Sequence, residues 1–343
     1  MRVLITGVAG FLGSHLAERF LSQGYEVLGI DNLNNSYDVR LKEWRLAQLQ
    51  GTRNFLFNRI DINDRTALQT KIFELHRSDP KNPIEASVNL AARAGVRQSV
   101  EDPWAYYQTN VIGTLNLLEI SKEYGIPKFL QASTSSVYGS RSNSTELNEP
   151  ENPHQLDKPF REDDSTDRPL SPYAASKKAA EVLCHSYYHL YGLDATVFRF
   201  FTVYGPAGRP DMSVFRFIKW IDSGENVSVF GDGMQQRDFT YVEDIAKGVT
   251  AALTLTGFNT INLGGAKPAQ LIEMIRMLED LLGKKSNLSY SPADPTDVRA
   301  TWADVSKARE KLDWSPQTRL EDGLASAVEW YQQNRSWAQH TLT

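Results

Sequence analysis

The sequence predicts an α/β protein with a doubly wound parallel sheet, followed by a smaller α/β domain. Short apolar runs of strand length alternate with amphipathic helical patterns through the first half of the chain and somewhat beyond it. A glycine-rich turn joins the first strand to the first helix, and after Gly205 the alternation becomes less regular. Repeated βα units of this kind form a parallel sheet that helices cover on both faces.

The predicted elements begin at the first residues. The run "RVLIT" is apolar throughout, which is typical of a strand buried on both faces. Further strands are predicted at "YEVLGID", "NFLFNRID", "ASVNLAA", "KFLQAS" and "DATVFRFF". Helical periodicity is found at about 10–23, 64–76, 104–124 and 173–191, and later near 214–223, 242–255 and 269–282. The later part also contains a predicted strand at "VSVF" and two more helical patterns in the tail.

These patterns predict two domains. Residues 1–205 form the sheet domain, with a polar insertion at about 140–170, and residues 206–343 form mainly a substrate-binding domain. The insertion is punctuated by proline and has no period, so it is predicted to be a loop. It is either a lid that contacts substrate or a surface insertion. We favour the surface insertion, because surface loops accept extra length at little cost.

Composition excludes several classes of protein. The chain has 343 residues and a net charge of −5, which gives no basic footprint for nucleic acid and no polybasic membrane anchor. Its apolar runs are too short to span a bilayer, and the N-terminus does not read as a signal peptide. The only cysteine is Cys184, so no intramolecular disulfide can form and we expect a reducing, cytoplasmic location.

The turn "TGVAGFLGSH" predicts a Rossmann-type dinucleotide site. Gly7, Gly10 and Gly13 permit a tight turn and a close approach of the backbone to a pyrophosphate, which then lies at a helix N-terminus. Asp31 ends the second strand, at the distance from Gly13 that this motif requires, and its carboxylate can accept hydrogen bonds from both ribose hydroxyls. A 2′-phosphate would be repelled there, so the predicted cofactor is NAD rather than NADP.

Residues near the ends of the first, second, third and fourth strands complete the predicted cofactor site. Asp61 and Ile62 follow the third strand, where an adenine edge can be read, although Asp61 is equally suited to cap the next helix. The remaining predicted cofactor residues are Phe11, Leu12, Asn32, Leu90, Ala91 and Ala92.

The segment "SPYAASKKAAE" contains a candidate catalytic pair. Tyr173 and Lys177 are four positions apart at a helix start, so their side chains share one helix face. A phenol is a poor base at neutral pH, because its unperturbed pKa is about 10. A neighbouring ammonium and a positively charged nicotinamide both favour the phenolate and lower that pKa. Lys177 can also hold the nicotinamide ribose.

With these motifs the chain resembles the extended short-chain dehydrogenases/reductases that act on nucleotide sugars. The resemblance covers nearly the whole length and includes "NLAARAGV", "STSSVYG", "RFFTVYGP" and "GDGMQQRDFTYVEDIA". It implies that Thr134 hydrogen-bonds the reacting sugar hydroxyl, that Tyr173 removes its proton, and that Tyr173 and Lys177 also contact the cofactor. It further implies that Arg237 and Arg299 bind a nucleotide diphosphate, for which bidentate guanidinium donors are suited. A homodimer formed by the helices at 104–124 and 173–191 is also implied.

Two serines separate the alternatives within this family. A 4,6-dehydratase carries an Asp-Glu pair after the catalytic Thr, and a glucuronate decarboxylase typically carries a Glu, whereas Ser135 and Ser136 stand here. Neutral hydroxyls cannot take the proton that elimination requires, but they can donate to a substrate carboxylate. Thr202 stands where hexose 4-epimerases more usually have Asn, and Arg97 is another candidate for carboxylate binding. The segments "AARAGVRQS" and "TVYGPAGRPDM" look like those of UDP-glucuronate 4-epimerases.

We therefore expect NAD-dependent 4-epimerisation of a UDP-sugar through a 4-keto intermediate, with UDP-glucuronate as the expected substrate. Epimerisation of UDP-glucose or UDP-GlcNAc is the alternative, and UDP-glucuronate decarboxylation is less favoured. A non-catalytic NAD-binding regulatory protein is a different class, and it would be expected to lack Thr134, Tyr173 or Lys177. No metal site is predicted, since His185 and His189 lack a third ligand. Core packing is the expected role of most aromatic residues on the helices at 104–124 and 173–191.

Overall fold

Seven strands form one parallel sheet, which confirms the predicted fold class. The protein is seen in a computed structural model that describes residues 1–140, 158–294 and 297–342. The sheet has the strand order β11-β6-β5-β4-β1-β2-β3, and every neighbouring pair in it is parallel. Its strands are β1 (Arg2–Thr6), β2 (Glu26–Asp31), β3 (Phe55–Arg59), β4 (Ile84–Asn89), β5 (Lys128–Thr134), β6 (Asp194–Phe200) and β11 (Phe258–Leu263).

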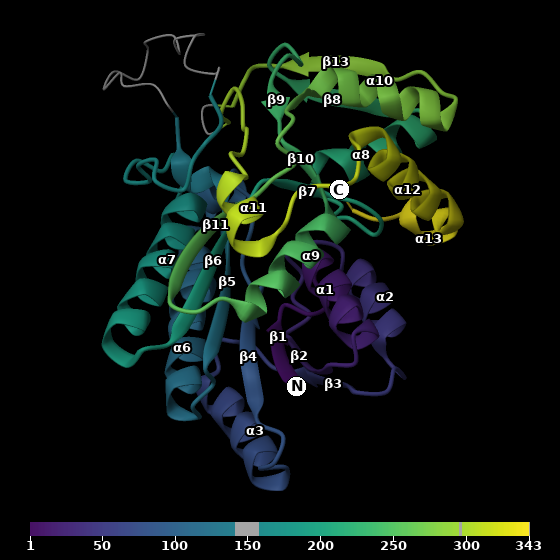
Figure 1. Ribbon diagram of the computed structural model, residues 1–343. Helices are drawn as coiled ribbons and strands as arrows, with labels where there is room; N and C mark the ends of the chain where they lie inside the picture. Colours follow the sequence, from purple (N-terminus) through teal and green to yellow (C-terminus); the bar gives the residue numbers. More distant parts are fainter. Residues whose placement is uncertain (141–157, 295–296, 343) are drawn as a thin grey trace.

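Alternate side chains of the strands enter two different apolar cores. Val3 and Ile5 of β1 pack into one core and Leu4 packs into the other, as the two-residue period of a strand requires. The first face is covered by α1 (Phe11–Ser22), α9 (Val242–Ala251) and α11 (Ser306–Leu312). The second face is covered by α3 (Arg65–Ser78), α6 (Gly113–Glu123) and α7 (Pro172–Tyr191). Figure 1 shows α6 and α7 together on one side of the sheet and α1 and α9 on the other.

A third core belongs to the part of the chain that lies above the carboxyl ends of the strands (Figure 1). It is formed by α8 (Ser213–Ser223), α10 (Leu271–Leu282), α12 (Leu320–Gln333) and β8 (Asn226–Phe230), together with α2 (Val39–Leu49). Three two-stranded sheets accompany it, with the pairs β7–β10, β8–β13 and β9–β12. The remaining strands are β7 (Thr202–Tyr204), β9 (Gln236–Arg237), β10 (Phe239–Tyr241), β12 (Ala269–Gln270) and β13 (Asn287–Ser291).

The short helical elements complete the described chain. They are α4 (Gln98–Glu101), α5 (Pro103–Tyr107), η1 (Gln108–Ile112), η2 (Ser135–Tyr138), η4 (Ala252–Thr254) and α13 (Arg335–Ala338). Within the described residues, no helix is long and apolar enough to cross a membrane. The first part of the predicted insertion, 141–157, lies outside the described residues. Its last part returns to the fold at Phe160, which is buried and pairs with Ala303 in a parallel bridge.

Two differences from the sequence prediction bear on the domains. The seventh strand of the main sheet, β11, comes from residues 258–263, beyond the predicted boundary at 205. The sheet face that α1 covers is also covered by α9 and α11 from the later part of the chain. The division at 205 stays a prediction, and the two parts share a core.

Candidate active site

The turn between β1 and α1 is shaped by close backbone contacts. Gly7 has a φ of +70°, and a Cβ at Gly13 would lie 2.1 Å from the carbonyl oxygen of Gly7. Gly10 caps α1 without a side-chain hydrogen bond, so the first N–H groups of the helix remain available to a ligand. Amide donors at a helix N-terminus, on a surface without side chains, fit the pyrophosphate of a dinucleotide.

Asp31 organises the next part of this site. Its carboxylate is buried at the end of β2 and accepts hydrogen bonds from the amides of Ala9, at 3.1 Å, and Leu33, at 2.8 Å. Asn32 donates to the carboxylate of Asp61 at 2.7 Å, which links the segments that follow β2 and β3. The predicted adenosine-binding residues therefore form one hydrogen-bonded edge beside the glycine turn.

A single cavity of about 370 Å³ runs from the glycine turn to the carboxyl ends of β5 and β6. All predicted cofactor residues line it, and so do all three predicted catalytic residues. The predicted substrate residues Ser135, Ser136 and Thr202 line the same cavity. At this reacting end, the described lining residues include no carboxylate, since Asp31 and Asp61 lie at the cofactor end.

The catalytic pair is placed by the start of α7. Ser171 caps this helix through a hydrogen bond from the amide of Ala174, and Pro172 occupies the first turn. Burial raises the pKa of Tyr173, while a hydrogen bond with Thr134 and the positive charge of Arg209 act in the opposite direction. Burial also lowers the pKa of Lys177 to about 8. Lys177 therefore titrates close to neutral pH, as is typical of groups at functional sites.

Hydroxyl groups surround the position of Thr134. Thr134 ends β5, and its hydroxyl lies 3.2 Å from the hydroxyl of Ser136 and accepts from the Ser136 amide at 3.2 Å. Ser135 and Ser136 begin the 3₁₀ turn η2, directly after Thr134. Thr202 begins β7, and its amide donates to the carbonyl oxygen of Asp238 at 3.0 Å. Among the described residues, this end of the cavity offers hydrogen-bond donors to an anion and no carboxylate to repel it.

The three predicted substrate arginines lie outside the cavity lining. Arg97 is held by Asp294, at 2.9 Å, and by Asp297, at 2.5 Å, with its guanidinium 3.9 Å from the ring centroid of Phe230. Its donors thus contact carboxylates of this chain, and the carboxylate-binding role predicted for it stays a prediction. The pairing joins segments that lie far apart in the sequence, which no local pattern reveals.

Arg237 and Arg299 lie near each other. Arg237 donates to the carbonyl oxygen of Gln236 at 2.8 Å and to the carbonyl oxygen of Arg299 at 3.4 Å. Burial lowers the pKa of Arg237, while the nearby charge of Asp297 raises it and that of Arg97 lowers it. Arg299 is exposed. Their predicted contact with a diphosphate stays a prediction.

The sequence analysis did not single out Arg209, which lines the cavity, or Asn110, which contacts α7 without lining the cavity. Arg209 lines the cavity, donates to the carbonyl oxygen of Ala94 at 3.3 Å, and pairs with Asp211 at 3.0 Å. Asn110 lies in η1, where the helix predicted over 104–124 changes to π-helical bonding. Its side chain bonds both backbone groups of Arg93 and the hydroxyl of Ser176. Helical periodicity cannot show a π-turn, and an arginine in an irregular loop carries no pattern of its own.

Fold and site together define the class of the protein. A Tyr-x-x-x-Lys pair on one helix face, opposite a hydroxyl at a strand end and beside a dinucleotide cradle, is the arrangement of a short-chain dehydrogenase/reductase of the extended type. Within that class, the family described as GDP-mannose 4,6 dehydratase matches residues 4–327. The chain belongs to this family.

Relatives within the family are similar along the whole chain. A UDP-glucuronate 4-epimerase from Thermodesulfobacterium geofontis is 51% identical over 332 residues, with 96% of each chain covered. Among solved structures, the UDP-glucuronic acid 4-epimerase from Bacillus cereus in complex with UDP-glucuronic acid and NAD has a TM-score of 0.86 and 36% identity, covering 97% of this chain and 100% of that one. A UDP-glucose 4-epimerase from Thermotoga maritima with UDP-glucose has a TM-score of 0.85 and 33% identity, covering 98% and 100%.

Proposed function

We propose that this protein is an NAD-dependent UDP-glucuronate 4-epimerase, which interconverts UDP-glucuronate and UDP-galacturonate. The observation that supports this proposal most directly is the lining at the reacting end of the cavity. The described residues next to Tyr173 present hydroxyl groups and no carboxylate there. An acid at this position would repel a uronate and would serve elimination instead. The similarity to UDP-glucuronate 4-epimerases supports the same substrate.

Each catalytic residue has a separate role in the proposed reaction. Tyr173 takes the proton of the sugar 4-hydroxyl, to which Thr134 is hydrogen-bonded, and returns it after the sugar has turned. The ammonium of Lys177 stabilises the phenolate of Tyr173. The glycine turn, Asp31 and Lys177 would hold NAD, which would supply a reversible hydride acceptor for C4 of the sugar.

The carboxylate of the substrate sets an additional requirement. A 4-keto uronate is a β-keto acid and tends to lose carbon dioxide. Ser135, Ser136 and Thr202 donate hydrogen bonds to that carboxylate and hold it in an orientation unsuited to decarboxylation.

Incubation with NAD and a panel of UDP-glucuronate, UDP-glucose and UDP-GlcNAc, with products identified by NMR, tests the proposal. UDP-galacturonate is the expected product. UDP-xylose would identify a decarboxylase, and turnover of the neutral sugars alone would identify a hexose 4-epimerase. NAD binding without turnover of any sugar would identify a regulatory protein.

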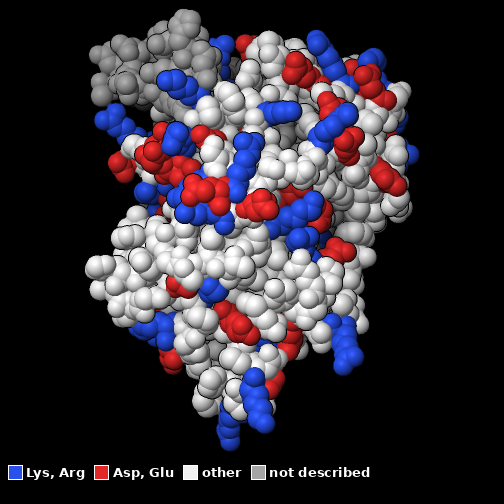
Figure 2. Space-filling model, viewed as in Figure 1, with Lys and Arg blue, Asp and Glu red and all other residues white. Residues whose placement is uncertain are grey.

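We further propose that the protein is a homodimer joined through the helices at 104–124, which comprise α5, η1 and α6, and at 173–191, which is α7. Figure 2 shows a largely uncharged surface over these helices. Core packing accounts for Tyr106 and Tyr187, but Trp104 is 83% exposed, and Tyr107 and Tyr188 are also exposed, contrary to the expected core role. A second copy of the chain would cover this apolar face, because monomers rarely expose such patches.

Sedimentation tests the dimer. The wild type is expected to sediment as a dimer and Val182→Glu, on the exposed face of α7, as a monomer. Phe73→Glu, equally apolar and exposed but on α3, is the matched control and should leave the dimer intact. A monomeric wild type would contradict the proposal.

A cytoplasmic location and a role in carbohydrate metabolism remain predictions.

A further inference from the structure

A buried ion pair lies between the catalytic helix and the sheet. Glu181 of α7 and Arg199 of β6 are each 4% exposed. The guanidinium donates to both carboxylate oxygens, from Nε to Oε1 at 3.1 Å and from Nη2 to Oε2 at 2.9 Å. Burying two charges is costly even when they are paired, so an apolar pair would serve stability as well. The position of this pair therefore calls for another explanation.

Glu181 is connected to all three predicted catalytic residues. Tyr173, Lys177 and Glu181 follow at intervals of four positions, which places them along one face of α7. On the facing strand, the hydroxyl of Ser133 donates to Oε1 of Glu181 at 2.5 Å. Ser133 directly precedes Thr134, so the carboxylate fixes the strand end that carries Thr134 relative to the helix that carries the pair.

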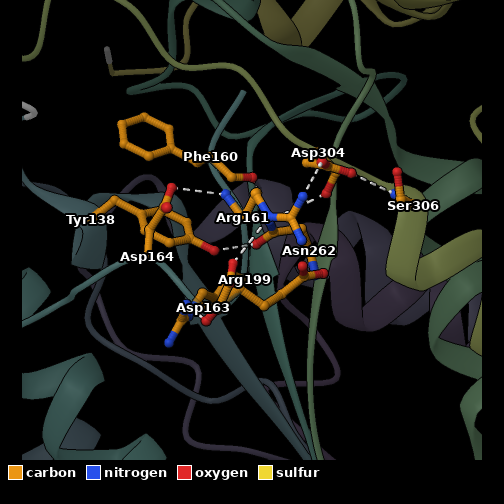
Figure 3. Close-up of polar contacts among 10 residues, drawn as sticks. Tyr138, Phe160, Arg161, Asp163, Asp164, Arg199, Asn262, Asp304 and Ser306 are labelled. Atoms are coloured by element: carbon orange, nitrogen blue, oxygen red, sulfur yellow. Dashed lines mark hydrogen bonds and ion pairs between the residues drawn. The ribbon is translucent and has the colours of Figure 1, made fainter. Parts of the chain in front are cut away.

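Beyond Glu181, Arg199 contacts Glu162 and Tyr138, and Figure 3 shows Arg199 and Tyr138 with their neighbours. Its Nη1 donates to the carbonyl oxygen of Glu162 at 3.1 Å, and its guanidinium lies 4.8 Å from the ring centroid of Tyr138. Tyr138 donates to Oδ1 of Asn262 at 2.6 Å, and Asn262 donates to the carbonyl oxygen of Phe160 at 2.9 Å (Figure 3). The segment 160–164 thus contacts Arg199 directly through the Glu162 carbonyl and indirectly through Asn262 and Tyr138.

We propose that Glu181 is a positioning residue for the Tyr173–Lys177 pair, locked in place by Arg199 and by the segment 160–164. Only the expected effect on kcat and KM rests on the proposed function, whereas the positioning role itself does not. Glu181 does not line the cavity, so it acts through Lys177 and Ser133 rather than on the substrate.

The charge of Glu181 reinforces its geometric role. Burial lowers the pKa of Lys177 to about 8, and the Glu181 carboxylate and the Cys184 thiol act in the opposite direction. The charged or titratable groups around this helix face are Tyr173, Lys178, Glu181 and Cys184 on α7, Arg199 on β6, Arg209 in the cavity wall and Tyr106 on α5. The ammonium of Lys178 lies 3.8 Å from Oε2 of Glu181. Without Glu181, the charge of Arg199 would be unbalanced and Lys177 would lose its proton at lower pH.

The decisive variant is Glu181→Gln, measured in the NAD-loaded protein. The pH titration of the isotope-labelled Nζ resonance of Lys177, identified by its absence in Lys177→Met, should move down by about one unit. With UDP-glucuronate, kcat should fall roughly tenfold or more while KM stays within about twofold, because substrate contacts are intact. The alkaline limb of the kcat profile should move to lower pH with the Lys177 titration.

Glu119→Gln is the matched control. Glu119 also accepts a hydrogen bond from α7, through the hydroxyl of Tyr187, but it lies away from the cavity. Its variant should leave the titration of Lys177 and the pH profile unchanged. An unchanged titration and kcat in folded Glu181→Gln would overturn the proposal.

Two further variants keep the test decisive if Glu181→Gln does not fold. The double variant Glu181→Gln/Arg199→Met removes both buried charges and should fold, and the titration of Lys177 should still move to lower pH, by less than in Glu181→Gln, because the unbalanced charge of Arg199 is gone as well. Ser133→Ala retains the ion pair and should lower kcat several-fold at constant KM. Wild-type behaviour in either of them would overturn the proposal. Because the titration needs no sugar, failure of the proposed substrate would be recognised separately.

Discussion

The two ends of the cavity are built from different parts of the chain. At the cofactor end, backbone atoms of one turn form the part predicted to hold the pyrophosphate, where Gly7 and Gly13 leave no room for side chains. At the reacting end, side chains from three separate elements meet, namely Thr134, Tyr173 and Thr202. The first end is specified locally by sequence, whereas the second exists only when the sheet and its helices are packed. Substitutions should therefore affect cofactor affinity at one end and chemistry at the other.

The sharpest test of this division is Tyr173→Phe. Removing the phenol should lower kcat by about 10²- to 10⁴-fold, the usual contribution of a positioned acid–base group. NAD affinity, measured by calorimetry, should stay within about threefold of the wild type, since the glycine turn is untouched. Turnover within tenfold of the wild type would remove Tyr173 as the base.

Gly13→Ala should have the next largest effect, and it should change NAD affinity rather than kcat. The added Cβ would lie 2.1 Å from the Gly7 carbonyl oxygen, so the turn must shift at a cost of about 1–3 kcal/mol. NAD affinity should fall roughly ten- to hundredfold, while kcat at saturating NAD changes little. Ser22→Ala, at the far end of α1, is the control and should bind NAD normally. A loss of kcat with unchanged affinity would contradict the division.

Thr202→Val should have the smallest effect, and it separates substrates. The valine keeps the shape and the backbone hydrogen bond to Asp238 but loses the hydroxyl. A hydrogen bond to a charged group contributes about 1.5 kcal/mol or more, so kcat/KM for UDP-glucuronate should fall roughly tenfold. Any activity on UDP-glucose should change less. An equal loss on both sugars would count against a carboxylate at this position.

Much of the sheet could be predicted from sequence, because most of its strands are apolar runs and its first turn has a glycine signature. Helix α2 was missed for a physical reason. Its buried positions include Lys42 and Arg45, which bond to carbonyl oxygens of neighbouring loops, so the inner face of the helix is not apolar. Strand β11 was missed because polar residues, Asn259, Thr260 and Asn262, interrupt "FNTINL", so it is neither a continuous apolar run nor a regular alternation.

The candidate site was predicted best where function depends on spacing within one element. The glycine turn and the pair Tyr173 and Lys177 are of this kind. Arg97 was assigned by its nearness to a motif, but Asp294 and Asp297 hold it from a distant segment. Arg209 lies in an irregular loop, and the course of that loop places its side chain in the cavity wall. Contacts between remote segments depend on packing, which neither period nor spacing encodes.

The late position of β11 in the chain has a consequence for biosynthesis. When synthesis has passed Gly205, six of the seven strands of the main sheet have been made, but the apolar face later covered by α9 and α11 is still bare. The nascent chain must therefore wait for β11 and these helices before this core can close. A fragment that ends at Gly205 should aggregate when it is expressed alone, and chaperones should retain it.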